Sequence, residues 1–227
     1  MQLLATKPPQ TPTDWAVFGV ILAVVIAVMM LVGLYHSRRR KALLAAAGEL
    51  GLAPVDLKSP DAQFVHELVK GQRSPKIRLC AVGFLGDQSA RLAEYTYVTG
   101  YGKHSRTWHS LQVSLECPES WPAVHLGTAP GFMNRPISDL FKGRNPVTED
   151  AAFDKRWQPQ GNVAEAARML TPELRAYLMQ GEKTELWSIK EGWITCTWRR
   201  ACKTTDLPRL IARVQQARSL VAAAVGG

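Results

Sequence analysis

The hydrophobic pattern of this chain changes near residue 36. From Trp15 to Tyr35 the side chains are apolar or small, and none is charged. About 20 helical residues at 1.5 Å rise cross a hydrocarbon core roughly 30 Å thick, so this run predicts a transmembrane helix. Trp15 and Tyr35 stand at its two ends, where amphipathic rings suit the membrane interfaces. We therefore expect a single-pass membrane anchor.

A cleaved signal peptide is the alternative interpretation of this run. Such a peptide has a basic start, a shorter apolar core and small residues at its cleavage site. Before the run only Lys7 and the terminal amine are positive, and Tyr35-His36 followed by arginines stands where small residues would be expected. The sequence therefore favours an anchor that is retained.

The charges beside the run predict its orientation. A cluster of four consecutive cations follows it directly: Arg38, Arg39, Arg40 and Lys41. Before it, Lys7 is partly offset by Asp14. Lys and Arg near a helix end bias that end to the cytoplasm, so we expect the N-terminus outside a bacterial inner membrane and the main domain in the cytoplasm. The cluster is also expected to contact anionic lipid headgroups.

Beyond the anchor the pattern alternates with period two. We expect strands over Lys76–Leu85, Ala90–Thr99 and Arg106–Cys117, with a shorter one over Ala123–Leu126. In the third strand, His109, Leu111, Val113, Leu115 and Cys117 share one face, and Ser110, Gln112, Ser114 and Glu116 share the other. That alternation is typical of a half-buried antiparallel strand. A second hairpin is expected from Glu185 to Lys190 and from Gly192 to Trp198, turning at Glu191-Gly192.

Helical signals flank these strands. A short helix is expected over Ala62–Lys70, and Thr171 precedes a proline and an acid as an N-cap does, with Gly181 closing that helix. The segment Asp206–Val225 carries an apolar face that should pack on the sheet. Residues 127–162 are rich in Gly, Pro, Asn and Asp; a short helix at 136–141 and a strand at 153–157 are expected within them.

The expected fold class is α+β, an antiparallel sheet flanked by helices behind one N-terminal transmembrane helix. By composition the chain has four parts. They are a Pro-rich tail outside the membrane (1–14), the transmembrane helix (15–35), a basic juxtamembrane helix (36–51) and the cytoplasmic domain (52–227).

The net charge of +9 invites a nucleic-acid interpretation. The cluster at 38–41 supplies four of those charges, and its place beside a membrane helix explains it as a topology signal. No RNP-type or KH-type motif is present, so we expect no nucleic-acid partner.

Motifs for catalysis are missing from the sequence. There is no GxxxxGK[ST], GxGxxG, GxSxG, HExxH or CxxC motif. His104 and His109 point to opposite faces of a strand, so they are not expected to share a metal ion. The cysteines have no framework-like spacing and are expected to be reduced, buried thiols. We therefore expect no cofactor, no metal and no enzymatic activity.

Two features suggest protein partners. Gly19, Ala23 and Ala27 recur on one face of the membrane helix, where small residues allow another helix to approach closely. Trp121 and Trp157 lie in or near predicted loops and are candidate exposed anchors, because tryptophan is enriched at interface hot spots.

Several short stretches resemble a group of bacterial single-pass membrane proteins whose cytoplasmic α+β domain has no assigned activity. They are "LLAAAGELGLAP", "AEYTYV", "HSLQVSLECPESWP", "MLTPELRAYL", "LWSIKEGWITCTWR" and "LPRLIARVQQARSLV". The resemblance spans roughly residues 42 to 225. It implies the same architecture and brings no catalytic residues with it.

These patterns together favour a non-catalytic, membrane-anchored accessory or scaffold subunit. Its helix and cytoplasmic domain would pack against integral membrane subunits of a larger complex, and respiratory and photosynthetic complexes contain many such single-helix subunits. One alternative is a membrane-tethered enzyme, such as a hydrolase using His109, Asp154 or a cysteine in a cleft. Another is a lipid or small-molecule sensor.

Overall fold

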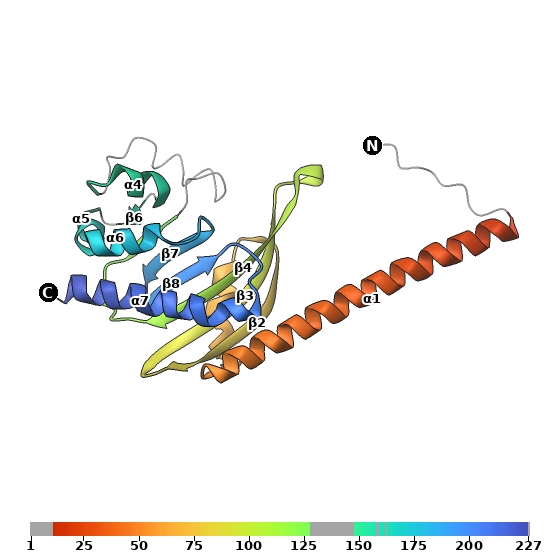
Figure 1. Ribbon diagram of the computed structural model, residues 1–227, viewed down its shortest axis with the longest axis horizontal. Coiled ribbons are helices and arrows are strands. Elements are labelled where there is room, and N and C mark those ends of the chain that lie inside the picture. The colour runs from red at the N-terminus through yellow and green to blue at the C-terminus, as the bar shows by residue number, and fades with distance from the viewer. Residues whose placement is uncertain (1–10, 128–147, 158, 162, 227) are drawn as a thin grey trace. The chain divides into compact units, whose positions relative to one another are not determined.

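The structure is a computed structural model, and it describes residues 11–127, 148–157, 159–161 and 163–226. The chain forms two compact units, Met1–Ala42 and Leu43–Gly227. The second unit contains the sheet and its helices (Figure 1).

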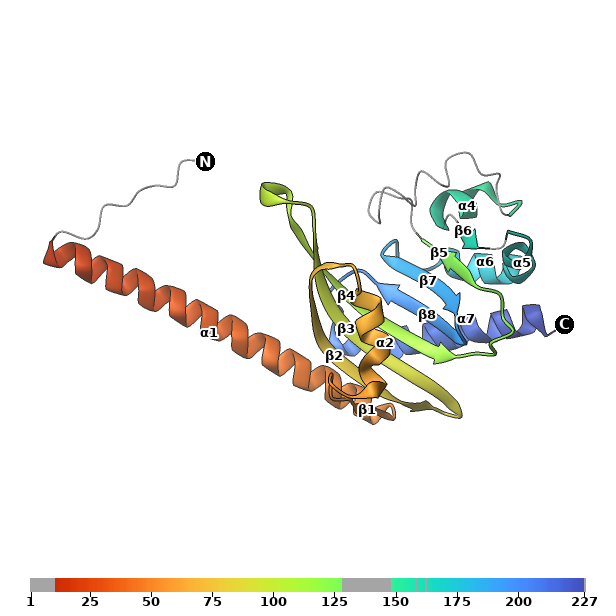
Figure 2. The ribbon, with the colours of Figure 1, turned by 180° about the vertical axis from the view of Figure 1, so that it is seen from behind.

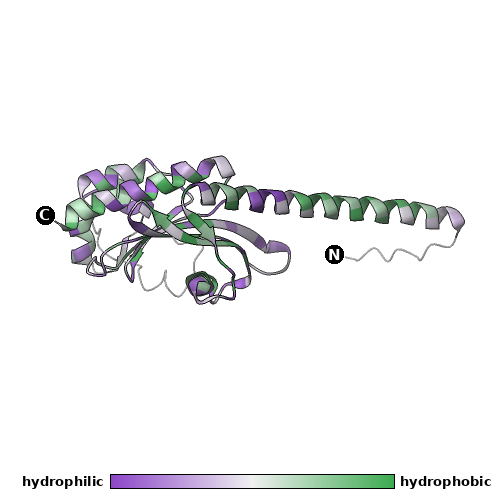
Figure 3. Cartoon of the chain, turned by 90° about the horizontal axis from the view of Figure 1, so that it is seen from below, coloured by the Kyte–Doolittle hydropathy of each residue, from purple (hydrophilic) through white to green (hydrophobic). Residues whose placement is uncertain are grey.

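Helix α1 (Pro12–Glu49) contains the predicted anchor. Among the described residues it is the one helix long and apolar enough to cross a membrane. Figure 3 shows a long green stretch of α1 followed by a purple segment, as expected for an apolar run that ends in a basic cluster. The helix continues unbroken through that cluster, and the chain leaves it at Gly51, whose φ is +89°. A positive φ at this position favours glycine.

The last turns of α1 belong to the folded domain. Leu43 and Ala47 are fully buried in its main core. The second unit therefore begins at Leu43, earlier than the boundary at residue 52 that the sequence suggests. The cause is the apolar stripe on these turns, which packs on the sheet and does not stand free as a juxtamembrane helix.

The described strands form one antiparallel sheet in the order β1-β2-β3-β4-β8-β7-β5-β6. Each predicted strand beyond the anchor is present except one, at 153–157. The strands are β1 (Leu52–Pro54), β2 (Arg73–Leu85), β3 (Gln88–Thr99), β4 (Arg106–Glu116), β5 (Val124–Leu126), β6 (Pro159–Gly161), β7 (Glu185–Lys190) and β8 (Trp193–Trp198).

Helices lie on both faces of this sheet. Figure 1 shows α7 (Leu207–Val225) running across one face, near α5 (Val163–Met169) and α6 (Pro172–Met179). The expected apolar face of α7 is buried there, in the same core as the apolar residues of β4 and β8. Figure 2 shows α2 (Gln63–Val69) on the opposite face, beside β2 and β3. Short 3₁₀ turns occupy Pro60–Ala62, Gly102–His104 and Thr204–Asp206. The α+β fold class is confirmed.

Local signals explain several element boundaries. The Thr171 hydroxyl accepts a hydrogen bond from the Leu174 backbone N–H at 3.3 Å, as an N-cap should. Glu191 and Gly192 have φ values of 52° and 76°, the paired positive angles of a type I′ hairpin turn. Both predictions are confirmed.

The strand predicted at 153–157 is wrong, because this segment is helix α4 (Ala151–Trp157). The Asp150 carboxylate accepts hydrogen bonds from Ala152 N at 3.0 Å and Phe153 N at 2.9 Å, which caps the helix start. Helix α5 and the short strands β1 and β6 were not predicted. The helix predicted at 136–141 lies outside the described residues.

Candidate functional site

The polar face of the sheet forms the candidate site. On β4, Ser110, Gln112 and Ser114 point away from α7, and the antiparallel register places Gln112 opposite Thr197 and Ser114 opposite Thr195 on β8. Alternation in both strands thus brings two rows of hydroxyl and amide groups onto one face.

These groups are joined by hydrogen bonds. Thr197 Oγ1 donates to Gln112 Oε1 at 3.2 Å, Gln112 Nε2 donates to Ser114 Oγ at 3.1 Å, and Thr195 Oγ1 donates to Ser114 Oγ at 2.9 Å. Gln112 and Ser114 are buried, although the sequence predicted a half-exposed strand. Side chains of neighbouring elements rise around them and remove this face from solvent.

One wall of the site comes from β3 and α2. Tyr95 and Tyr97 on β3 are buried, and their rings stack at 6.2 Å between centroids. They belong to a second core with Val65 and Val69 of α2. Burial raises the pKa of Tyr95 to about 12, and the neighbouring Ser110 hydroxyl opposes that shift only in part. Both phenols therefore remain protonated at neutral pH and can donate hydrogen bonds.

The opposite wall comes from β5 and β7, where His125 and Ser188 are register partners. Together the walls and floor enclose a hollow of about 420 Å³, which we call the polar hollow. This volume lies within the range of small-molecule sites. Its lining residues include Phe64, Arg91, Tyr95, Tyr97, Ser110, Gln112, Ser114, His125, Ser188, Lys190, Trp193, Thr195, Thr197 and Arg199.

Arg199 dominates the charge in the polar hollow. Burial lowers the pKa of His125, and the Arg199 cation lowers it further. The same cation lowers the pKa values of Tyr95 and Tyr97 against the effect of burial. The hollow therefore has a positive potential, and His125 is neutral at pH 7.

Arg91 stands at the other end of the hollow. Its guanidinium lies 3.6 Å from the Trp193 ring centroid and 5.0 Å from that of Phe64, so it is held between two aromatic faces. The carboxylates near the rim have their own partners. Glu191 pairs with Lys190 at 2.7 Å, and Glu67 pairs with Lys70 at 3.2 Å.

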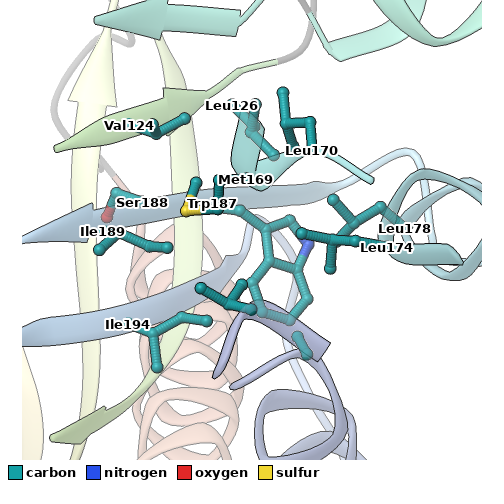
Figure 4. Close-up of a pocket in the computed structure, with 12 residues that line it drawn as sticks. Val124, Leu126, Met169, Leu170, Leu174, Leu178, Trp187, Ser188, Ile189 and Ile194 are labelled. Atoms are coloured by element: carbon teal, nitrogen blue, oxygen red, sulfur yellow. The ribbon is translucent and has the colours of Figure 1, made fainter. Parts of the chain in front are cut away.

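A second space lies on the other side of the sheet, between β7 and helices α5 and α6. Figure 4 shows Trp187 with Leu174 and Leu178 in this region, and the lining is almost entirely apolar. Its volume is about 20 Å³, barely enough for one water molecule. This space is a packing gap in the core, so it is not a candidate site.

The residues considered for hydrolysis do not converge in the structure. Asp154 accepts hydrogen bonds from Thr148 N at 2.9 Å and Thr148 Oγ1 at 3.0 Å, which is a local structural role. His109 lies on β4 and does not line the polar hollow. Within the described ranges, no group of three His, Cys, Asp or Glu residues is arranged to hold a metal ion.

All four cysteines are buried and none forms a disulfide bond, as predicted. Burial raises the pKa of Cys80, Cys117 and Cys202 to about 11 and that of Cys196 well above its ordinary value. Since the thiolate is the reactive form, these thiols are poor nucleophiles at neutral pH.

The predictions of partner-binding residues differ in how they compare with the structure. Trp157 is 0% exposed, so its prediction as an exposed anchor is wrong; its ring packs beside Phe153 in the main core. Trp121 is partly buried against that core, and the Arg218 guanidinium lies 6.0 Å from its ring centroid. On α1, Gly19, Ala23 and Ala27 lie within the exposed apolar stretch, and their role in helix packing stays a prediction.

Sequence reasoning missed Arg199, His125 and Trp193 as site residues. The signal that could have found them is the polar half of the alternation in "HSLQVSLE" and "WITCTWRR". Two strands with matching polar rows can share one polar face, but only if they are paired in register. That pairing joins segments more than 80 positions apart.

Comparisons with known proteins bear on the fold. A crystal structure of the mycobacterial trehalose monomycolate transport factor A, TtfA, matches with a TM-score of 0.55 and 13% identity, covering 82% of this chain and 94% of that chain. This chain shares the fold of TtfA. No protein-family model and no curated protein matches the sequence. At this identity the likeness to TtfA concerns the fold alone.

Proposed function

We propose that this protein is a non-catalytic accessory subunit, anchored in the bacterial inner membrane by α1, that serves a membrane transport assembly. The observation that carries the proposal is the fold shared with TtfA, a transport factor, over 94% of the TtfA chain. The long apolar helix in front of that fold supports an anchor.

The proposed arrangement gives each unit a task. Gly19, Ala23 and Ala27 pack against a transmembrane helix of the partner, since small residues let two helix backbones approach closely. The domain, on the cytoplasmic side, contacts the inner surface of the same partner. A respiratory or photosynthetic complex has no support in the comparisons, so a transport assembly takes its place in the proposal.

The test is extraction of the full chain in a mild detergent, followed by native electrophoresis and mass spectrometry. We expect it to migrate with an integral transport protein in a fixed ratio. The double variant Ala23→Ile and Ala27→Ile should release it, because larger side chains separate the helices. Enlarging Val25 and Val28 to Phe, about half a turn away around the helix, adds at least as many carbons at each position; it is the control and should leave the complex intact. A chain that migrates as a lone monomer would refute the proposal.

A membrane-tethered sensor of small molecules is the second candidate function. The polar hollow favours it, because a buried row of hydrogen-bonding groups beside an arginine is suited to ligand binding. The effect of a ligand on partner association distinguishes a sensor from an accessory subunit. A sensor needs a ligand to change its association with a partner, whereas a constitutive subunit stays associated without one.

A further inference from the structure

The polar hollow contains more positive charge than its own carboxylates balance. Three cations line it, namely Arg91, Lys190 and Arg199, and its two acids are paired with lysines. Arg91 is held by the aromatic rings of Trp193 and Phe64. Within the described part of the chain, Arg199 has no ion pair with a carboxylate. It is therefore the cation available to a ligand.

Two polar atoms in the hollow lack a partner. Arg199 Nε and Ser110 Oγ are both buried from solvent and form no hydrogen bond of ordinary length and angle with a described residue, although the Ser110 hydroxyl lies near the Tyr95 and Tyr97 phenols. Ser110 is 1% exposed, and it lies on β4 opposite Tyr95. A buried donor without an acceptor costs roughly 1 to 3 kcal/mol, so such groups in native proteins usually have a role or a bound partner.

The environment of Arg199 specifies the charge of that partner. Tyr95, Tyr97 and His125 line the hollow together with Arg199, and all three are neutral at pH 7. Neutral donors around an uncompensated guanidinium form a site for an oxyanion, because arginine presents parallel N–H groups that match carboxylate and phosphate oxygens.

The remainder of the floor specifies what the oxyanion is attached to. Gln112, Ser114, Thr195 and Thr197 form an uncharged row next to this site, and each has hydrogen-bonding capacity left after the bonds within the row. Such a row fits a chain or ring that carries hydroxyl groups. Trp193 adds an aromatic face at the rim.

We propose that the polar hollow binds a small hydroxylated ligand through one oxyanion, a phosphate or a carboxylate, held by Arg199 and Ser110. The hydroxyl groups of the ligand lie over Gln112, Ser114, Thr195 and Thr197. Such a ligand is either a free polyol or sugar phosphate, or the headgroup of an anionic phospholipid. The proposal does not depend on the accessory role, because it concerns a site within one domain.

The test uses the full chain in phosphatidylcholine nanodiscs, titrated with glycerol 3-phosphate, glucose 6-phosphate and inorganic phosphate by isothermal calorimetry. We expect saturable binding of at least one ester, more tightly than inorganic phosphate. Arg199→Gln should weaken that binding at least tenfold, and Ser110→Ala by a smaller factor. Arg168→Gln makes the same charge change at an exposed site on α5 and should leave the affinity unchanged.

A measurement on the unaltered protein tests the proposal even if one of the variants fails to fold. Hydrogen exchange of β4 and β8 should slow when the ester is bound to the original chain, since the ligand covers their polar face. Arg199→Lys, which retains the charge but loses the planar fork, should recover part of the affinity. Absence of saturable binding by all three probes, or equal affinity in Arg199→Gln and the original chain, would overturn the proposal.

A second set of nanodiscs distinguishes the two sources of ligand. If a lipid headgroup is the occupant, replacing phosphatidylcholine by phosphatidylglycerol should weaken the binding of the free ester at least threefold by competition. If a free solute is the occupant, the affinity should be the same in both membranes. Each result supports the site and identifies the source of its ligand. Neither result tests whether the protein joins a transport assembly.

Discussion

Among single residues, Glu185 is the buried carboxylate that ties the far end of the sheet together. It is 1% exposed and accepts hydrogen bonds from Arg213 Nε at 2.8 Å and Nη2 at 2.9 Å. It also accepts from Trp187 Nε1 at 3.2 Å and Trp198 Nε1 at 3.3 Å. One side chain thus joins β7, β8 and α7.

We expect Glu185→Ala to lower the free energy of unfolding by about 3 to 5 kcal/mol, because it leaves the buried Arg213 cation without a carboxylate partner. Chemical unfolding followed by circular dichroism of the full chain in detergent measures the loss. Glu165→Ala on the exposed side of α5 is the control, and its effect should stay within about 0.5 kcal/mol. A similar loss in both variants would contradict the role given to Glu185.

The charge of Arg199 makes a second prediction at this scale. Because that cation lowers the pKa of His125, Arg199→Gln should raise the His125 pKa toward its ordinary value. Titration of the His125 imidazole followed by NMR measures this pKa in both chains. The pKa of His125 is lower in the folded chain than in the unfolded chain. As the pH falls below about 6.5, the unfolded chain therefore binds more protons at this residue, and the folded state loses stability. Arg199→Gln should show a smaller loss over this window, whereas Arg168→Gln should behave like the original chain.

At the scale of elements, the end of α1 is part of the domain and not a free linker. Leu43 and Ala47 are fully buried, while Ala45 between them is exposed. Since an α-helix has a period of 3.6 residues, positions 43 and 47 share one face and position 45 lies on the other. Helix α1 therefore contributes residues to both compact units of the chain.

The burial of one face of α1 predicts different effects for an alanine-to-leucine change at positions 47 and 45. Ala47→Leu should destabilise the domain by about 1 to 3 kcal/mol, because the added carbons have no room in a packed core. Ala45→Leu adds the same atoms at an exposed position and should have little effect. Thermal unfolding of both variants in detergent provides the comparison, and equal melting temperatures would show that these turns are not docked.

At the scale of the whole molecule, we propose that the basic cluster Arg38 to Lys41 determines which side of the membrane the domain occupies. The buried cysteines make this testable, because none of them is accessible in the folded domain. A single introduced cysteine then reports its own location with little background.

We expect the cysteine of Thr13→Cys to react with a membrane-impermeant maleimide in intact spheroplasts. The cysteine of Ala223→Cys, at an exposed position near the end of α7, should react only after the membrane is permeabilised. The original chain, carried through the same steps, measures the background. The reverse labelling pattern would place the domain outside and contradict the proposed cytoplasmic arrangement.

The sequence by itself determined the elements whose signals are local. The apolar run predicted α1, period-two alternation predicted β2, β3 and β4, and Thr171 and Gly192 marked a helix start and a hairpin turn. These signals depend on neighbours within one or two turns of the chain, so they can be recognised without knowing the fold.

The tertiary structure alone decided which of these residues share a surface. Trp157 became core because a capped helix carries it inward. The polar row of β4 joined that of β8 because the two strands pair in register, and side chains of neighbouring elements bury it. Arg199, Ser110 and His125 come from distant parts of the sequence, and no local pattern relates them. Their convergence depends on the strand order of the sheet, which arises from long-range pairing.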